Sequence, residues 1–169
     1  MPKTHQYRVV DSSFLDTAPI RGALRQRIPA SAAATFRSFE DADAWPLWLD
    51  PVTKIEWTSP QPFGVGTTRD ITIRGRVVSE TFYTWDDGTR MSFYFASGQL
   101  PLFAAFAEDY ELVPVGTYEC ELVWRYGFEC VGAFKLVQSL IGFGFERAAM
   151  KSLVQLGDYM AANRGRYDM

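Results

Sequence analysis

The segment that decides the fold is FKLVQSLIGFGFERAAMKSLVQLGDYMAAN, residues 134–163. It contains no proline, and from residue 145 onward its charged and amide side chains recur every three or four positions, as they would on one face of a helix. The opposite face carries Phe145, Ala149, Leu153, Leu156 and Met160. The spacing therefore predicts a long amphipathic helix with at most one break, whose wide apolar face needs a partner layer.

The first half of this helix is apolar nearly all round and contains Gly142 and Gly144. A glycine inside a helix costs roughly 1 kcal/mol relative to alanine, so a structural requirement should explain each one. Two interpretations are open. The glycines permit a kink or a close contact between the helix and a sheet, or this half of the helix lines a cavity.

Composition argues against several classes of function. The chain has 169 residues, of which 47% are hydrophobic and 15% aromatic, enough for the core of one domain. The formal net charge of −3 leaves no basic surplus for phosphate groups, so we expect no nucleic acid partner. One histidine and two cysteines are too few for a Cys/His zinc site, and we expect neither a metal nor an organic cofactor.

The sequence gives no indication of export or stable membrane insertion. Residues 1–20 lack the apolar core of a signal peptide, and the longest apolar run, residues 100–107, is too short to span a bilayer. With free thiols and no export signal, we expect a cytoplasmic protein. Its oligomeric state cannot be read from these patterns.

Ahead of the helix, alternating apolar and polar residues predict an antiparallel sheet. About seven strands are expected, at residues 20–28, 52–57, 67–74, 76–85, 90–96, 104–113 and 117–128. Two short helices, residues 32–39 and 41–49, should follow the first strand, and residues 1–19 should form an N-terminal arm on a body at residues 20–163. One face of such a sheet must be covered, so the order predicts an α+β fold with the long helix as the cover.

Four short motifs carry a resemblance to a known superfamily. They are DAWPLW at residues 43–48, GVGTTR at 64–69, ETF at 80–82 with Trp85, and EDY at 108–110. The chain resembles the START-like, or SRPBCC, superfamily, and within it the polyketide cyclase/dehydrase and lipid-transport group, over residues 20–163. The resemblance implies the helix-grip fold, in which the sheet wraps around the C-terminal helix and a deep cavity between them takes an apolar molecule.

Members of this superfamily pair the first strand with the last. That pairing would place the outward arginines of the first strand opposite outward glutamates of the last. The residues concerned are Arg21, Arg25, Arg27, Glu119 and Glu121. We interpret them as cross-strand ion pairs and not as a binding patch.

Strand alternation places Arg69, Glu80 and Glu108 on faces that are otherwise apolar. A buried charge must be paired or neutralised, so we expect Arg69 to pair with one carboxylate and the other acid to be partly protonated. Three interpretations are open. The charges fix strand register or meet water at a cavity mouth, they orient a carbonyl or hydroxyl of a ligand, or Glu80 or Glu108 acts as a general acid/base.

Two placements stay open at this level. In residues 76–85, Val77, Tyr83 and Trp85 form a rival to the inward face that contains Glu80. Residues 97–103 are either a loop tucked on the body or a lid over the entrance of the cavity.

We therefore expect a protein that binds or transports an apolar or amphipathic small molecule, lipid- or polyketide-like, between sheet and helix. A polyketide cyclase/dehydratase is the first alternative, and a protein-interaction module is the second. The residues expected to contact the ligand are Arg69, Glu80, Phe93, Phe95, Phe106, Glu108, Tyr110, Tyr118, Trp124, Tyr126 and Phe145.

Overall fold

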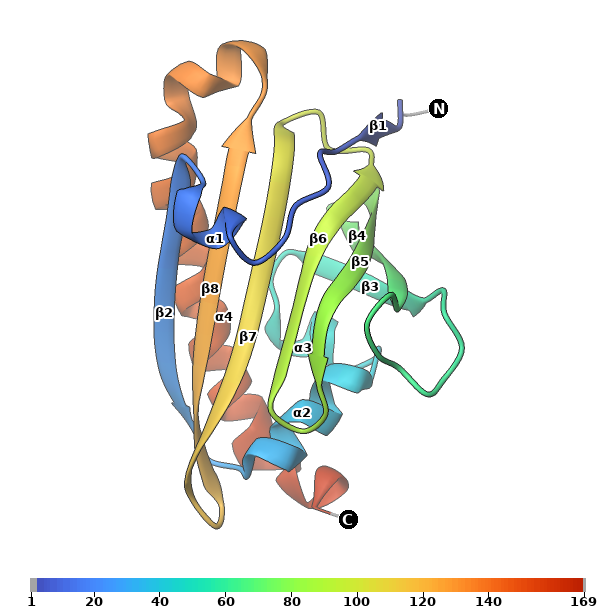
Figure 1. Cartoon of the computed structure of the whole chain (residues 1–169). Coiled ribbons are helices and arrows are strands. Elements are labelled where there is room, and N and C mark those ends of the chain that lie inside the picture. The colour runs from blue at the N-terminus through green and yellow to red at the C-terminus, as the bar shows by residue number, and fades with distance from the viewer. Residues whose placement is uncertain (1–2, 169) are drawn as a thin grey trace.

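The computed structural model describes residues 3–168, and its elements follow the predicted order (Figure 1). The helices are α1 (Phe14–Thr17), α2 (Ala32–Glu40), α3 (Trp45–Trp48), the 3-10 helix η1 (Gly132–Val137) and α4 (Gln138–Tyr167). The strands are β1 (His5–Gln6), β2 (Ile20–Ile28), β3 (Val52–Trp57), β4 (Thr68–Ile73), β5 (Arg76–Asp86), β6 (Arg90–Gly98), β7 (Phe103–Gly116) and β8 (Glu119–Cys130).

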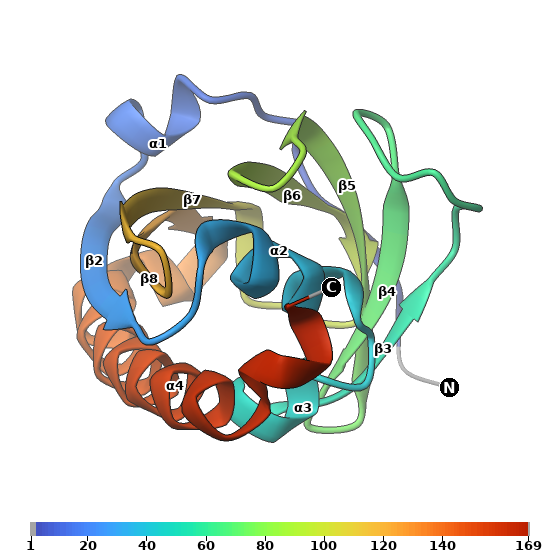
Figure 2. The same cartoon turned by 90° about the horizontal axis from the view of Figure 1, so that it is seen from below.

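All strands belong to one antiparallel sheet. Its order is β2-β8-β7-β6-β5-β4-β3, with β1 paired to β6 outside this path. Figure 2 shows the sheet curled around its concave side, with α4 lying across the gap between the β2 edge and the β3 edge. The predicted helix-grip fold is confirmed, and the space between α4 and the sheet becomes the place to look for a site.

The predicted pairing of the first long strand with the last is also present. Arg25 and Arg27 of β2 reach Glu121 and Glu119 of β8 at 2.8 and 3.3 Å. Arg21 differs, because its guanidinium donates to a backbone carbonyl at 2.8 Å. These partly exposed pairs contribute little stability each, and they lie on the side of the sheet away from α4.

The two glycines of α4 have different surroundings. A Cβ placed on Gly142 would lie 2.6 Å from Cγ2 of Ile20, so this glycine permits the close packing of α4 on β2. A Cβ on Gly144 would meet no atom of residues 3–168 within 4 Å. Close contact with the sheet therefore accounts for Gly142 and leaves Gly144 without a role inside one molecule.

The C-terminal end of α4 extends beyond the predicted boundary at residue 163 and is fastened to α2. The hydroxyl of Tyr167 donates to Asp41 at 2.8 Å, and Arg37 Nε donates to the carbonyl oxygen of Tyr167 at 2.6 Å. Tyr159 and Tyr167 share a further hydrogen bond of 2.6 Å between their hydroxyls. These contacts fix the end of the helix that closes the fold.

The N-terminal arm docks on the convex face of the sheet. Phe14 and Leu15 of α1 are buried against Ala105 and Ala107 of β7. The hydroxyl of Tyr7 donates to the carbonyl of Leu100 at 2.9 Å and accepts from its backbone N–H at 3.1 Å. The loop before β7 therefore lies against the arm, and none of residues 97–103 lines the cavity between α4 and the sheet.

The open placement in β5 is resolved by a β-bulge. The register of β5 on β6 shifts between Phe82 and Thr84, so strict alternation fails at this point. Glu80 and Phe82 are buried on the concave face, and Trp85 beyond the bulge packs against the same core. Of the rival set, Val77 is exposed and Tyr83 packs on the cluster under the N-terminal arm, so only Trp85 turns inward and the face with Glu80 is the concave one.

No helix within residues 3–168 is long and apolar enough to cross a membrane.

Candidate functional site

A cavity of about 100 Å³ lies between α4 and the concave face of the sheet. The predicted residues that line it are Arg69, Glu80, Phe93, Phe95, Phe106, Glu108, Trp124 and Phe145. They come from β4, β5, β6, β7, β8 and α4, so the cavity exists only once the sheet has curled around the helix. Its volume is below the 300–1,000 Å³ typical of small-molecule pockets.

Three predicted residues lie outside the cavity wall. Tyr110 is buried beside Glu108, and Tyr126 donates a hydrogen bond to Glu146 at 3.1 Å in a groove beside α4. Tyr118 was wrong as a cavity residue, because its side chain is 61% exposed in the turn that precedes β8. Strand alternation was extended into that turn, where it no longer decides which way a side chain points.

The sequence prediction missed the helical wall and the mouth of the cavity. Ala148, Ala149 and Ser152 of α4 line it, together with Trp45 of α3 and the segment from Leu49 to Val52. Ser152 carried a usable signal, since a serine on the buried face of an amphipathic helix needs a partner. Its Oγ is buried without a hydrogen bond to any residue in the described part of the chain.

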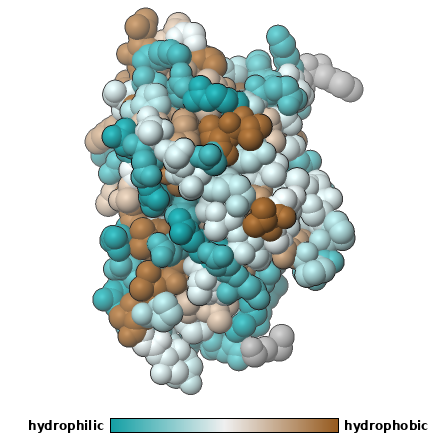
Figure 3. Space-filling view, in the orientation of Figure 1, coloured by the Kyte–Doolittle hydropathy of each residue, from teal (hydrophilic) through white to brown (hydrophobic). Residues whose placement is uncertain are grey.

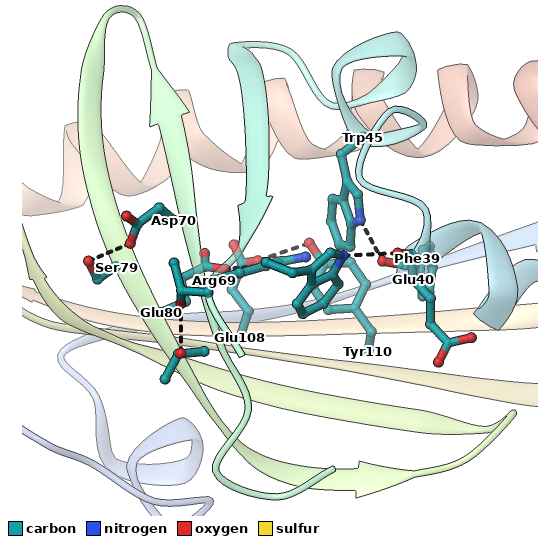
Figure 4. Close-up of polar contacts among 12 residues, drawn as sticks. Phe39, Glu40, Trp45, Arg69, Asp70, Ser79, Glu80, Glu108 and Tyr110 are labelled. Atoms are coloured by element: carbon teal, nitrogen blue, oxygen red, sulfur yellow. Dashed lines mark hydrogen bonds and ion pairs between the residues drawn. The ribbon is translucent and has the colours of Figure 1, made fainter. Parts of the chain in front are cut away.

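Arg69 forms the polar end of the cavity together with Glu80. The two residues are directly opposite in the β4–β5 ladder, and Arg69 Nε donates to Glu80 Oε2, with both side chains 1% exposed. Figure 4 shows this pair and Glu108 directed toward one another next to Trp45. The expected pairing of Arg69 with one carboxylate is therefore present.

Aromatic rings hold the guanidinium of Arg69 in place. Its central carbon lies 4.2 Å from the ring centre of Trp45, 4.8 Å from that of Phe93 and 5.1 Å from that of Phe82. Such cation–π contacts strengthen when water is excluded. Nη1 nevertheless has no hydrogen-bond partner within residues 3–168, so one donor of a buried cation remains free.

The second acid, Glu108, sits in a different environment. Its Oε2 accepts a hydrogen bond from the Tyr110 hydroxyl at 2.9 Å. Burial and, to a smaller extent, the nearby Glu80 carboxylate raise the pKa of Glu108, whereas Tyr110, Arg69 and the indole of Trp124 lower it, and the net result is a pKa of about 8. Glu108 is therefore mostly protonated at neutral pH and can donate a hydrogen bond.

Burial also raises the pKa of Glu80, but the adjacent Arg69 charge opposes this shift and favours the carboxylate. The two acids consequently differ in role. Glu80 balances the charge of Arg69, and Glu108 is a neutral acid in an apolar surrounding. Sequence reasoning anticipated one paired and one protonated acid without deciding which was which.

Two residues of the cavity wall carry polar atoms without partners. Arg69 Nη1 and Ser152 Oγ are buried and make no hydrogen bonds among the residues described. The Trp124 indole differs, because it is near enough to Glu108 to lower the pKa of that carboxyl, although its Nε1 makes no hydrogen bond of good geometry within residues 3–168. Buried polar groups without partners are rare in native proteins and call for an explanation.

The mouth of the cavity lies between α4 and the segment that joins α3 to β3. Asp50 and Pro51 line this side, and Lys151 Nζ of α4 lies 3.5 Å from Asp50 Oδ2. Both charged side chains are largely exposed, so the pair is weak and can open at little cost. Phe145, one turn before Ala149 on α4, packs against Phe106 and Tyr126 with ring centres 5.7 and 4.6 Å away.

Within residues 3–168, no three His, Cys, Asp or Glu side chains come together as a metal site would require. The cavity lining offers one guanidinium, the carboxyl groups of Asp50, Glu80 and Glu108, a serine and a wall of aromatic and aliphatic side chains.

Comparison with known proteins agrees with this architecture. Residues 20–161 match the family described as polyketide cyclase / dehydrase and lipid transport. An uncharacterized protein of Mycobacterium tuberculosis is 38% identical over 126 residues, which cover 73% of this chain and 74% of that protein.

Solved structures with low sequence identity share the fold. A START superfamily protein from Mycobacterium smegmatis has a TM-score of 0.64 at 16% identity, covering 88% of this chain and 97% of the other. The Zhui aromatase/cyclase from Streptomyces also gives 0.64, at 11% identity, covering 86% and 93%. The di-domain ARO/CYC protein BexL gives 0.70 at 14% identity, with 85% of this chain matching 47% of that longer protein. The chain belongs to the polyketide cyclase/dehydrase and lipid-transport family.

Proposed function

We propose that this protein binds an apolar small molecule that carries an oxygen acceptor, such as a ketone or a carboxylate, in the cavity beneath α4. The observation that carries the proposal is the buried Nη1 of Arg69, which has no hydrogen-bond partner within residues 3–168, in the wall of a largely apolar cavity. The protonated Glu108 supplies a second donor at neutral pH, and the aromatic rings supply the apolar contact area.

The ligand enters from the side of the Asp50–Lys151 pair with its oxygen leading. A cavity of about 100 Å³ holds a ring or a short chain, so a larger lipid- or polyketide-like ligand requires the wall to move. Phe145 and the segment from Leu49 to Val52 are the parts that must shift, since they separate the cavity from solvent. Family membership and the shared fold support this interpretation without identifying the natural ligand.

Native mass spectrometry of the protein purified from its own host tests the proposal. We expect one bound molecule per chain, apolar and with at least one oxygen. Ala148→Trp at the mouth should lower the bound fraction, and Ala162→Trp on an exposed turn of the same helix should not. A bound hydrocarbon without oxygen, or equal occupancy in both variants, would contradict the proposal.

A second candidate function is cyclisation or dehydration of a poly-β-keto substrate. One observation favours it: Glu108 has a pKa of about 8, near the value that suits a general acid or base at neutral pH. In this case Glu108→Gln should retain ligand binding and lose turnover, and the rate should depend on a group that titrates near pH 8. Unchanged turnover in Glu108→Gln would exclude this role for Glu108.

We further propose that residues 1–169 act as one START-like domain in the cytoplasm, with an N-terminal arm at residues 1–19 and a helix-grip body at residues 20–163. Cys120 and Cys130 are buried free thiols, which suits a reducing compartment. Fractionation of host cells with an antibody against the protein would test the location. Recovery in the secreted or the membrane fraction would contradict it.

A further inference from the structure

The outer face of α4 carries an uncovered apolar stripe. It consists of Leu140, Phe143, Met150 and Val154, which are between 55% and 71% exposed, interrupted by the exposed Arg147. Leu136, on η1 just before α4, is 89% exposed as well, but the non-helical backbone of Val137 separates η1 from α4, so Leu136 is not part of the stripe. In Figure 2 this side of α4 forms the outer rim of the molecule and no other element lies over it.

Among the described residues, the convex face of the sheet, on the opposite side of the molecule from α4, has no such apolar stripe. Figure 3 shows the convex side of the sheet as mostly polar or neutral, with separate brown patches in place of a continuous apolar band. Single exposed apolar residues are normal on protein surfaces, whereas an ordered row on one helix needs an explanation. The stripe on α4 is such a row.

The spacing of the stripe is that of a helix–helix contact. Its positions follow one another at intervals of three and four residues, the a/d pattern of a coiled coil. At 3.6 residues per turn they fall within about 80° of the helix circumference, which is narrower than the face of 100° or more by which a helix usually packs on a core.

A membrane surface fits this stripe poorly. Arg147 lies in the middle of it, where it would enter the acyl region, and the chain has a formal net charge of −3 that opposes anionic lipids. A second helix accommodates the same arginine readily, because a guanidinium can stack on an aromatic ring. Arg147 already lies over the ring of Phe143 in its own helix, at 5.8 Å.

We propose that the stripe on α4 binds the same stripe on a second copy of the chain, as an antiparallel helix pair. Positions a and d face each other in such a pair, and one register matches the four central positions of the stripe. Leu140 faces Met150 of the second copy, and Phe143 faces Arg147. All contacts repeat under two-fold symmetry, as an isologous interface requires.

The two-fold axis of this register passes next to Gly144. No atom within residues 3–168 approaches the position of a Cβ on Gly144, although a glycine inside a helix costs roughly 1 kcal/mol. A second helix crossing at this point gives the glycine a role, because the missing side chain lets the two backbones approach. Glu146 lies one turn from Phe143, so Arg147 of the second copy can reach its carboxylate as well.

Sedimentation velocity over a range of concentrations tests the dimer. A single helix pair is a small interface, so we expect reversible dimerisation at micromolar concentrations. Leu140→Glu places a carboxylate against Met150 twice per dimer and should raise the dissociation constant at least about tenfold. Val65→Glu is the matched control, because Val65 and Leu140 are both 71% exposed and Val65 lies in the loop before β4.

A further variant distinguishes this register from non-specific hydrophobic association. Phe143→Glu would face Arg147 of the second copy and should weaken the dimer much less than Leu140→Glu. The native cysteines are buried, so disulfide formation can be directed to the helix. Gly144→Cys should cross-link to itself under mild oxidation, and Leu140→Cys should cross-link to Met150→Cys in a mixture of the two.

Four results would overturn the proposal. The first two are a wild-type protein that is still a monomer at about 100 μM, and equal effects of Leu140→Glu and Val65→Glu on dimerisation. The third is efficient self-cross-linking of Met150→Cys, which would indicate parallel helices. The fourth is a wild-type monomer that binds phosphatidylcholine/phosphatidylglycerol vesicles, with that binding abolished by Leu140→Glu. Circular dichroism of each variant shows whether it remains folded.

Discussion

Replacing Glu108 with glutamine should remove a loss of stability that the wild-type protein suffers as the pH rises. Glu108 is protonated in the folded protein up to about pH 8, whereas a carboxyl in the unfolded chain ionises near its ordinary pKa of 4.5. Between these two values the folded state holds a proton that the unfolded state has released. Stability must then fall with increasing pH across this window and level off above it.

The size of the effect follows from the same two pKa values. Each unit of difference corresponds to about 1.36 kcal/mol, so the whole window amounts to roughly 5 kcal/mol at most. Relaxation of the protein and entry of water reduce this figure, and a loss of a few kcal/mol is expected. Glutamine keeps the shape and a hydrogen-bonding group, so it can still accept from Tyr110.

Urea denaturation of wild type and Glu108→Gln between pH 5 and 9 measures the effect. The two unfolding free energies should converge at high pH or cross in favour of the variant, because only the wild type must bury an ionised carboxylate. Glu56→Gln is the control, since the Glu56 side chain is 58% exposed on β3. If the wild-type and Glu108→Gln curves run parallel across the whole range, the assignment of Glu108 as a buried neutral acid is refuted.

Three further predictions concern stability. Glu80→Gln leaves the buried Arg69 without its counter-charge and should cost roughly 3–5 kcal/mol in urea denaturation, and a change within error would contradict the ion-pair assignment. Gly142→Leu overfills the contact with β2 and should lower the free energy of unfolding by about 1–3 kcal/mol, while ligand affinity per folded molecule stays the same. Loss of ligand binding in a folded variant would show that Gly142 borders the cavity and not only β2. Tyr167→Phe removes the hydroxyl that binds Asp41 and Tyr159 and should cost about 1–2 kcal/mol, measured by thermal unfolding, and an unchanged midpoint would mean that the end of α4 is not fastened there.

Much of the fold could be predicted from the sequence because its signals are local. Hairpin turns make neighbouring strands antiparallel, and one long amphipathic helix leaves few ways to cover the sheet. The same alternation placed Arg69, Glu80 and Glu108 on the concave face. It failed at Tyr118, where a turn interrupts the strand, and it was ambiguous in β5, where a bulge turns Trp85 inward as well.

The remaining features depend on contacts between distant parts of the chain. Arg69 pairs with Glu80 because the β4–β5 register sets them opposite each other, and alternation alone does not fix that register. The size of the cavity depends on where Phe145 of α4 packs against the sheet. The contribution of Ser152 and of the segment from Leu49 to Val52 likewise appears only after the helix has docked.

Calorimetric titration with two molecules of the same shape tests the central claim most directly. Acetophenone and α-methylstyrene differ in one group, a carbonyl oxygen in place of a methylene, and only the ketone can accept from Arg69 Nη1 and Glu108. The wild type should bind the ketone at least about tenfold more tightly, because the hydrocarbon leaves buried donors unpaired. The double variant Arg69→Leu with Glu80→Leu should reduce this preference, because it removes Nη1 and leaves Glu108 as the remaining donor. If wild type binds the hydrocarbon equally well, or binds neither molecule, the cavity is not a site for oxygen-bearing apolar ligands.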